Sequence, residues 1–308
     1  MKRLMPILIP LMLSLNACAE MPVARLKMYV HDENGMPVEG ATVQGYFTNL
    51  RYDYQPGPGR LGITNNEGVA QISGPALVSV NVEARKEGYY KSEQKIVVNK
   101  IRDQSISILL REKRDPIPMY AKKVVLKIPE RGQEYGFDFL EGDLVFTGHR
   151  GKQSDLSIKV IRELIDENKH TQVASVIFNN SADGVIYMTL DDKWKVSDFK
   201  TNYMAPLEGY KNSFEVVSTR SEAEYTSKNK NVPFYVRLRT TVDSEGKVVS
   251  AHYCKIWPGM DVYGALIEKP VIGMTYYCNH TINDRNIEFD VNKNLFKNLT
   301  SEQRVSVP

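Results

Sequence analysis

The sequence has few cysteines, few tryptophans and no long apolar run beyond its first residues. It contains 3 cysteines and 2 tryptophans among 308 residues. After Glu20, no stretch approaches the roughly 20 apolar residues that a membrane-spanning helix needs, so no such helix is predicted. A soluble chain of this length can bury the cores of two ordinary domains.

An excess of charge of one sign is also missing. The formal net charge is +3, with 40 basic and 37 acidic residues. Lys2 and Arg3 lie in an N-terminal leader, and without them 38 basic residues face 37 acidic ones, a net charge of about +1. This balance gives no electrostatic reason to expect a nucleic acid or an anionic membrane surface as partner.

The common catalytic and cofactor motifs are absent as well. The sequence has no phosphate-binding loop, no G-x-S-x-G elbow, no H-E-x-x-H pair and no EF-hand loop. We therefore assign no catalytic, cofactor-binding or metal-binding residue and expect no cofactor. The absence of these motifs favours a protein that is not an enzyme.

The N-terminal residues 1–19 have the pattern of a signal peptide. A positive start is followed by the apolar run Leu4–Leu15, which is too short to span a bilayer, and then by small residues. The pattern predicts an exported protein of a bacterial cell envelope, located in the outer membrane or the periplasm.

Two cleavage sites remain open. Leu15-Asn16-Ala17-Cys18 resembles a bacterial lipobox, which implies cleavage before Cys18, lipidation of its thiol and a membrane partner held by the acyl chains. Ordinary cleavage after Ala19 would instead release a soluble protein that starts at Glu20. We favour the lipid anchor, because a lone cysteine at this position needs an explanation.

From Arg25 to about Leu110 the sequence alternates between apolar and polar residues over short runs. About seven such runs are separated by turn residues, which predicts a β-sandwich of two sheets. The segment 52–62, rich in tyrosine, proline and glycine, is a candidate binding loop, although an ordinary exposed connection fits it too.

Three turn motifs occur in order in this region. They are Asp32 to Val43 (DENGMPVEGATV), Thr64 to Gly68 (TNNEG) and Lys86 to Tyr89 (KEGY). Together they resemble the carboxypeptidase regulatory-like domain of the transthyretin-like superfamily. The resemblance implies a β-sandwich over residues 20–112 that serves as a spacer or binding accessory and carries no catalytic residues.

A charged, proline-containing stretch follows, and we interpret residues 113–123 as a linker. Residues 124–308 are expected to form a second β-rich (α+β) domain, which makes the whole protein mainly β. Apolar spacing near 159–168 fits a strand or a helix, and 292–303 is a candidate terminal helix. The runs 173–178 and 185–190 predict a hairpin.

The clearest pattern of the second domain is a hairpin around the turn 243–246. A four-residue loop would pair Leu238 with Ala251, Arg237 with His252 and Tyr235 with Cys254. One face would then be core, and the other would carry a candidate ligand face of Tyr235, Arg237, Arg239 and His252. Two arginines with a histidine and a tyrosine suit a carboxylate or a sugar acid. A wet or domain-packing face is the plainer interpretation.

Cys254 and Cys278 form an even pair in an oxidising compartment and predict a disulfide. The alternative is a metal site with His252 and His280, but two thiols without histidines at finger-like spacing make a poor zinc site.

Two later segments, 237–247 and 283–290, resemble parts of uncharacterised bacterial envelope proteins in which they follow a similar sandwich. This resemblance implies a shared architecture and supplies no activity. The expected function is a non-enzymatic envelope lipoprotein whose second domain binds a protein, peptide or glycan. Two alternatives remain, a carbohydrate-active or hydrolytic enzyme and a structural subunit of a surface assembly.

Overall fold

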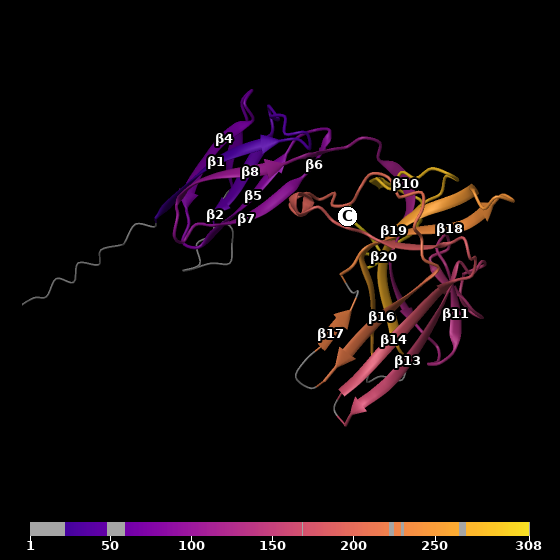
Figure 1. The fold of residues 1–308 in the computed structure, drawn as a ribbon. Helices are drawn as coiled ribbons and strands as arrows, with labels where there is room; N and C mark the ends of the chain where they lie inside the picture. The colour runs from indigo at the N-terminus through magenta and orange to yellow at the C-terminus, as the bar shows by residue number, and fades with distance from the viewer. Residues whose placement is uncertain are drawn as a thin grey trace, which may run out of the picture. The chain divides into compact units, whose positions relative to one another are not determined.

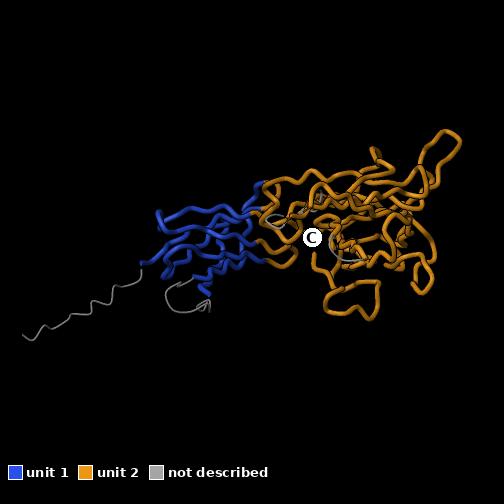
Figure 2. The backbone as a smooth tube through the Cα atoms, turned by 90° about the horizontal axis from the view of Figure 1, so that it is seen from below, with its two compact units in different colours: residues 1–31, 35–85, 93–108 blue, residues 32–34, 86–92, 109–308 orange. Residues whose placement is uncertain are grey.

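The fold is described from a computed structural model, within residues 22–47, 59–167, 169–221, 225–228, 231–264 and 269–307. The chain divides into unit 1 (residues 1–31, 35–85 and 93–108) and unit 2 (residues 32–34, 86–92 and 109–308) (Figure 2). Within the described ranges the only helical element is the short 3-10 helix η1 (Asp192–Trp194), and no helix is long and apolar enough to cross a membrane (Figure 1).

Unit 1 is a sandwich of a three-stranded sheet, in the order β4-β1-β8, and a four-stranded sheet, in the order β3-β2-β5-β7. Its strands are β1 (Val23–His31), β2 (Thr42–Phe47), β3 (Arg60–Ile63), β4 (Val69–Pro75), β5 (Ser79–Arg85), β7 (Ser92–Val97) and β8 (Asp103–Leu109).

Strict alternation explains these strands. In β1 the buried Leu26, Met28 and Val30 alternate with exposed residues, so one face of the sheet packs inward and the other meets water. The predicted sandwich of about seven strands is confirmed. The candidate binding loop 52–62 lies outside the described residues except for its last four positions.

Unit 2 contains two six-stranded sheets and one two-stranded ribbon. The β19 sheet has the order β15-β18-β19-β20-β10-β21, with β15 (Gly184–Tyr187), β18 (Phe234–Val242), β19 (Val248–Tyr263), β20 (Val271–Asn279), β10 (Ile117–Lys127) and β21 (Phe289–Asn294). The β14 sheet has the order β12-β11-β13-β14-β16-β17, with β12 (Asp143–Val145), β11 (Glu134–Asp138), β13 (Leu156–Asp166), β14 (Lys169–Phe178), β16 (Ser213–Arg220) and β17 (Tyr225–Lys228). The ribbon pairs β6 (Tyr89–Tyr90) with β9 (Arg111–Glu112).

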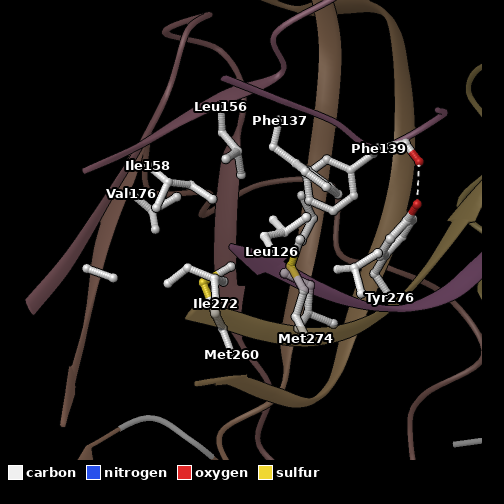
Figure 3. Close-up of a cluster of buried hydrophobic side chains, with 14 of the residues drawn as sticks. Leu126, Phe137, Phe139, Leu156, Ile158, Val176, Met260, Ile272, Met274 and Tyr276 are labelled. Carbon is white, nitrogen blue, oxygen red and sulfur yellow. Dashed lines mark hydrogen bonds between the residues drawn. The ribbon is translucent and has the colours of Figure 1, made fainter. Parts of the chain in front are cut away.

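The main core of unit 2 lies between these two sheets (Figure 3). Phe137 and Phe139 come from one side, while Met260, Ile272 and Tyr276 come from the β19 sheet. The ring of Tyr276 packs edge-on against both phenylalanines, and its hydroxyl donates to the carbonyl oxygen of Phe139 at 2.8 Å, which satisfies the one polar atom of this side chain.

The opposite face of the β19 sheet, its outer face, is covered over part of its length. A second core joins Tyr235, Tyr253 and Tyr277 of the sheet to Met188 and Ala205 of the long connection between β15 and β16. Central strands of this sheet are therefore buried on both faces there, and the expectation of one wet face fails over this region.

Several expected elements of the second domain are wrong. Residues 159–166 belong to β13, so of the two alternatives for 159–168 the strand is confirmed and the helix is wrong, and 292–303 forms no helix. The run 173–178 pairs with β13 and β16, whereas β15 pairs with β18 in the other sheet, so the predicted hairpin does not form. Strand β10 begins at Ile117, inside the segment 113–123 expected to be a linker. Its residues Met119 and Ala121 are buried.

Candidate functional site

The hairpin of β18 and β19 exists, but its predicted register is wrong by one residue. Arg237 pairs with Tyr253, and Leu238 pairs with His252. The pairing then shifts at Arg239, whose φ of 52° marks a bulge in β18. A one-residue slip moves every side chain of one strand to the other face of the sheet.

This register divides the candidate ligand face, because it places Tyr235 and Arg237 on one side of the sheet and His252 on the other. Tyr235 and Tyr253 belong to the core on the outer face, and Arg237, which pairs with Tyr253, lies on that face too. His252 aligns with Leu238, and its strand neighbour Cys254 belongs to the main core. Tyr235 and His252 therefore point to opposite sides of the sheet.

Arg237 is engaged by main-chain oxygens. Its guanidinium donates to the carbonyl oxygen of Ala182 at 2.6 Å and to that of Leu207 at 2.8 Å, and it lies 4.6 Å from the ring centre of Tyr210. The hydroxyl of Tyr235 accepts a hydrogen bond from Asn202 at 2.8 Å. The contacts with Leu207, Tyr210 and Asn202 attach the connection between β15 and β16 to the sheet, whereas Ala182 lies between β14 and β15.

Arg239 is engaged by carboxylates. Its Nε donates to Oδ1 of Asp155 at 2.8 Å, and its Nη2 donates to Oδ1 of Asp138 at 2.9 Å. Its backbone N–H donates to Oδ2 of Asp183, and the N–H of Thr240 donates to Oδ1 of the same residue, both at 2.8 Å. The bulge is thus held by three buried carboxylates.

The surroundings shift the pKa values of this cluster. Burial raises the pKa of Asp155, against the opposing pull of the Arg239 guanidinium. Burial also raises the pKa of Asp138. The backbone N–H groups of Gln153, Lys152 and Glu141 donate to this carboxylate and outweigh burial, so the pKa of Asp138 is lowered overall. Burial lowers the pKa of His252, whose Nδ1 lies 3.3 Å from the carbonyl oxygen of Asn279.

Cys254 and Cys278 form the predicted disulfide, which is confirmed. They lie directly opposite each other on β19 and β20, and both are fully buried in the main core. Among the described residues no group of histidines, cysteines and acids has the arrangement of a metal site. Cys18, the predicted lipidation site, lies outside the described residues.

A second cluster of buried charge surrounds Arg111 in unit 2. This fully buried guanidinium donates to Glu33 at 2.9 Å and to the carbonyl oxygens of Phe199 and Thr201, and it stacks 4.0 Å from the ring centre of Trp194. Its donors are directed to protein acceptors, as expected of a structural arginine.

An open groove of about 350 Å³ lies on the outer face of the β19 sheet, beyond the part that the second core covers. Asp261 of β19 and Val125 of β10 flank Gly273 of β20, one on each side. Other side chains that line this groove, called here the unit 2 groove, are Lys123, Asn231, Pro258, Tyr263 and Thr275.

The floor of the unit 2 groove is a tyrosine ring over a glycine. A Cβ atom at position 273 would lie 3.1 Å from Cε1 of Tyr263 and 3.6 Å from its hydroxyl oxygen, so the missing side chain makes room for the ring. Tyr263 remains 37% exposed and Val125 57% exposed, which leaves an aromatic and an apolar surface open at the groove.

Fixed polar groups form one wall. Oδ1 of Asp261 accepts hydrogen bonds from the hydroxyls of Tyr225 at 2.9 Å and Ser227 at 3.0 Å, both on β17. Burial and the contact with Asp261 raise the pKa of Tyr225 to about 12, so its hydroxyl stays protonated and keeps donating at neutral pH. The two donors orient the Asp261 carboxylate beside the Tyr263 ring.

Unit 1 also has a groove, of about 440 Å³, on the solvent face of the sheet β4-β1-β8. Its walls include Arg25, Lys27, Gln71 and Asp103, and the Arg25–Asp103 ion pair across it is highly exposed. Among the residues that the structure describes, no aromatic ring lines it. The unit 2 groove is therefore the better candidate site.

No protein-family description and no curated protein sequence matches this chain. Among solved structures it is similar to a DUF3823 family protein from Parabacteroides merdae, with 8% identity, 71% of this chain and 92% of that chain covered, and a TM-score of 0.23. A variant of the shaft pilin SpaA from Lactobacillus rhamnosus shows 12% identity, coverages of 72% and 89%, and a TM-score of 0.23. The major pilin subunit BcpA of Bacillus cereus shows 10% identity, coverages of 82% and 95%, and a TM-score of 0.23. Similarity at this level carries no argument about function.

Proposed function

We propose that this protein is a non-enzymatic, exported protein of the bacterial cell envelope, in which unit 1 serves as a spacer and unit 2 binds a ligand through the unit 2 groove. The observation that carries the proposal is the exposed Tyr263 ring beside the oriented Asp261 carboxylate, in a groove of about 350 Å³. Apolar surface next to a few fixed polar groups is typical of binding sites.

The contacts of Arg237 and Arg239, two residues of the candidate ligand face, favour non-enzymatic binding over hydrolysis. Arg239 is committed to Asp138 and Asp155, and Arg237 to two carbonyl oxygens. Neither arginine points into the unit 2 groove. An enzyme would have to use other residues.

The location in the envelope and the regulatory-like character of unit 1 rest on the sequence. The leader 1–19 supports export, and the lipobox-like Leu15–Cys18 supports an anchor in the membrane. Mass spectrometry of the mature N-terminus tests the anchor. A lipidated Cys18 is expected, whereas a free Glu20 would contradict it.

Binding is tested with the mature protein and a panel of soluble polysaccharides, cell-wall fragments and peptides, measured by calorimetry. The matched variant is Gly273→Leu, which fills the groove, and it needs no unusual backbone because Gly273 has no positive φ. We expect a ligand that binds the natural protein and not the variant. Equal binding by both proteins contradicts the groove, chemical turnover of the ligand favours the enzyme, and ordered polymers of the pure protein favour the structural subunit.

A further inference from the structure

We propose that the ligand of the unit 2 groove is a saccharide, with one sugar ring stacked on Tyr263 and its hydroxyls bound by Asp261 and the neighbouring polar side chains. This inference rests on the proposed binding function of the groove and specifies its ligand class.

The first argument is the aromatic surface. Gly273 leaves the space that the Tyr263 ring occupies, and a side chain at position 273 would displace it. The ring therefore lies over Gly273 with 37% of the residue exposed, in a groove of about 350 Å³. The C–H groups on one face of a sugar ring form an apolar surface that packs on such a ring, as other apolar groups pack on aromatic faces.

The second argument is the set of polar groups beside the ring. Asp261 is oriented by Tyr225 and Ser227, and Asn231 and Thr275 line the same groove. A sugar hydroxyl both donates and accepts, so carboxylate, amide and hydroxyl groups together match it. Lys123 and Asp261 both line the groove with opposite charges, so its lining carries no charge of one sign and favours a neutral polar ligand over a strongly charged one.

The third argument separates a saccharide from a peptide. Peptides commonly bind sheets by adding a strand at an open edge. The central strand under the groove, β20, pairs with β10 on one side and with β19 on the other, so its backbone groups are already taken. A peptide lying over β20 would find no backbone partner in that strand, whereas a stacked sugar needs none; β18 pairs with β19 only as far as Ile256, so a peptide would have to bind along β19 beyond that point.

The size of the groove also fits a saccharide ligand. Its volume of about 350 Å³ lies at the lower end of the range for small-molecule sites, roughly 300–1,000 Å³. A protein partner would need a far larger surface. The groove is open to solvent, so a short stretch of a longer glycan chain can lie in it.

The experiment compares Tyr263 variants on a glycan array, followed by calorimetry with the best soluble saccharide. We expect Tyr263→Ala to weaken binding about tenfold or more, since aromatic anchors dominate small interfaces. Tyr263→Phe keeps the ring and should stay within about threefold of the natural protein. The matched control is Tyr29→Ala, which removes a tyrosine that is 39% exposed on a sheet of unit 1 and should change nothing.

Thermal unfolding of each variant shows whether it folds, and Asp261→Asn, which keeps the size of the side chain, gives a second measure of the site. The inference is overturned if no saccharide binds, if Tyr263→Ala binds as well as the natural protein, or if only Tyr29→Ala loses binding. A peptide ligand that is lost with Gly273→Leu would remove the saccharide and leave the proposed binding function standing. Binding of every ligand unchanged by Gly273→Leu would remove both.

Discussion

Nε of Arg239 lies 2.8 Å from Oδ1 of Asp155, and this ion pair coincides with a backbone φ of 52° at Arg239. Residues other than glycine rarely adopt such a φ, so surrounding contacts must stabilise it. Here the bulge turns the side chain of Arg239 toward Asp155 and Asp138, and Asp183 binds the backbone N–H groups. The geometry of the strand and the burial of its carboxylates therefore depend on one another.

Replacing Arg239 by methionine should destabilise unit 2 by about 3 kcal/mol, because it leaves buried carboxylates without their cation. Both tryptophans, Trp194 and Trp257, belong to unit 2, so tryptophan fluorescence during urea unfolding reports on this unit. The control is Lys247→Met, which removes a highly exposed ion pair with Glu245 and should cost less than about 1 kcal/mol. Equal losses of stability in the two variants would show that the Arg239 cluster contributes no more than an exposed ion pair.

The disulfide should stabilise unit 2 chiefly by restricting its unfolded chain. Cys254 and Cys278 are separated by 24 positions, for which the loop-entropy relation gives a stabilisation of about 3.5 kcal/mol. We expect the double variant Cys254→Ala, Cys278→Ala to lose about this much in urea unfolding. A reducing agent should destabilise the natural protein and have no effect on the double variant. Insensitivity of the natural protein to reduction would speak against the bond.

His252 should make unit 2 less stable in mild acid. Burial lowers the pKa of folded His252 below its ordinary value of 6.5, so between these two pKa values the unfolded state binds a proton that the folded state does not. Stability should therefore fall as the pH drops below about 6.5 toward the folded-state pKa. The variant His252→Gln should show a smaller fall in melting temperature between pH 7 and pH 5. The control is His31→Gln in unit 1, and an identical pH profile for all three proteins would refute this role of His252.

Alternation along strands made much of the fold predictable. In β1 the pattern of buried and exposed residues follows the sequence residue by residue, and the seven-stranded sandwich follows from it. The pattern misled at 159–168, since Val160, Ile161, Leu164 and Ile165 also have helical spacing. The end of β13 is exposed on both faces, so the sheet offers no buried partner that would impose an alternation there.

The site was harder to predict than the fold. The register of the β18–β19 hairpin depends on the bulge at Arg239, and a positive φ at an arginine leaves no mark in the sequence. The unit 2 groove joins Val125, Asp261 and Gly273 from three strands, and only the pairing of those strands brings them together. A glycine inside a strand was the one local signal, because it often marks a close approach of other groups.

A last prediction concerns Lys255, which is fully buried between the rings of Phe199 and Tyr277 and donates one hydrogen bond to Thr201 at 3.2 Å. Burial lowers the pKa of its ammonium group well below the ordinary value of 10.5. At pH 7 the unfolded lysine is protonated, so folding must either release that proton or bury the charge, and both cost free energy.

Lys255→Met should therefore stabilise unit 2 at pH 7, by about 1 kcal/mol or more, since a methionine of similar volume fits between the two rings. The difference should shrink as the pH rises toward 10, because the unfolded lysine then gives up its proton and the natural protein gains stability with pH. Tryptophan-monitored urea unfolding at pH 7 and pH 9.5 measures both effects. The control is Lys127→Met on β10, an exposed position that should change stability by less than about 0.5 kcal/mol. A loss of stability in Lys255→Met at pH 7 would instead mean that the hydrogen bond to Thr201 and the two rings outweigh the cost of burying the amine.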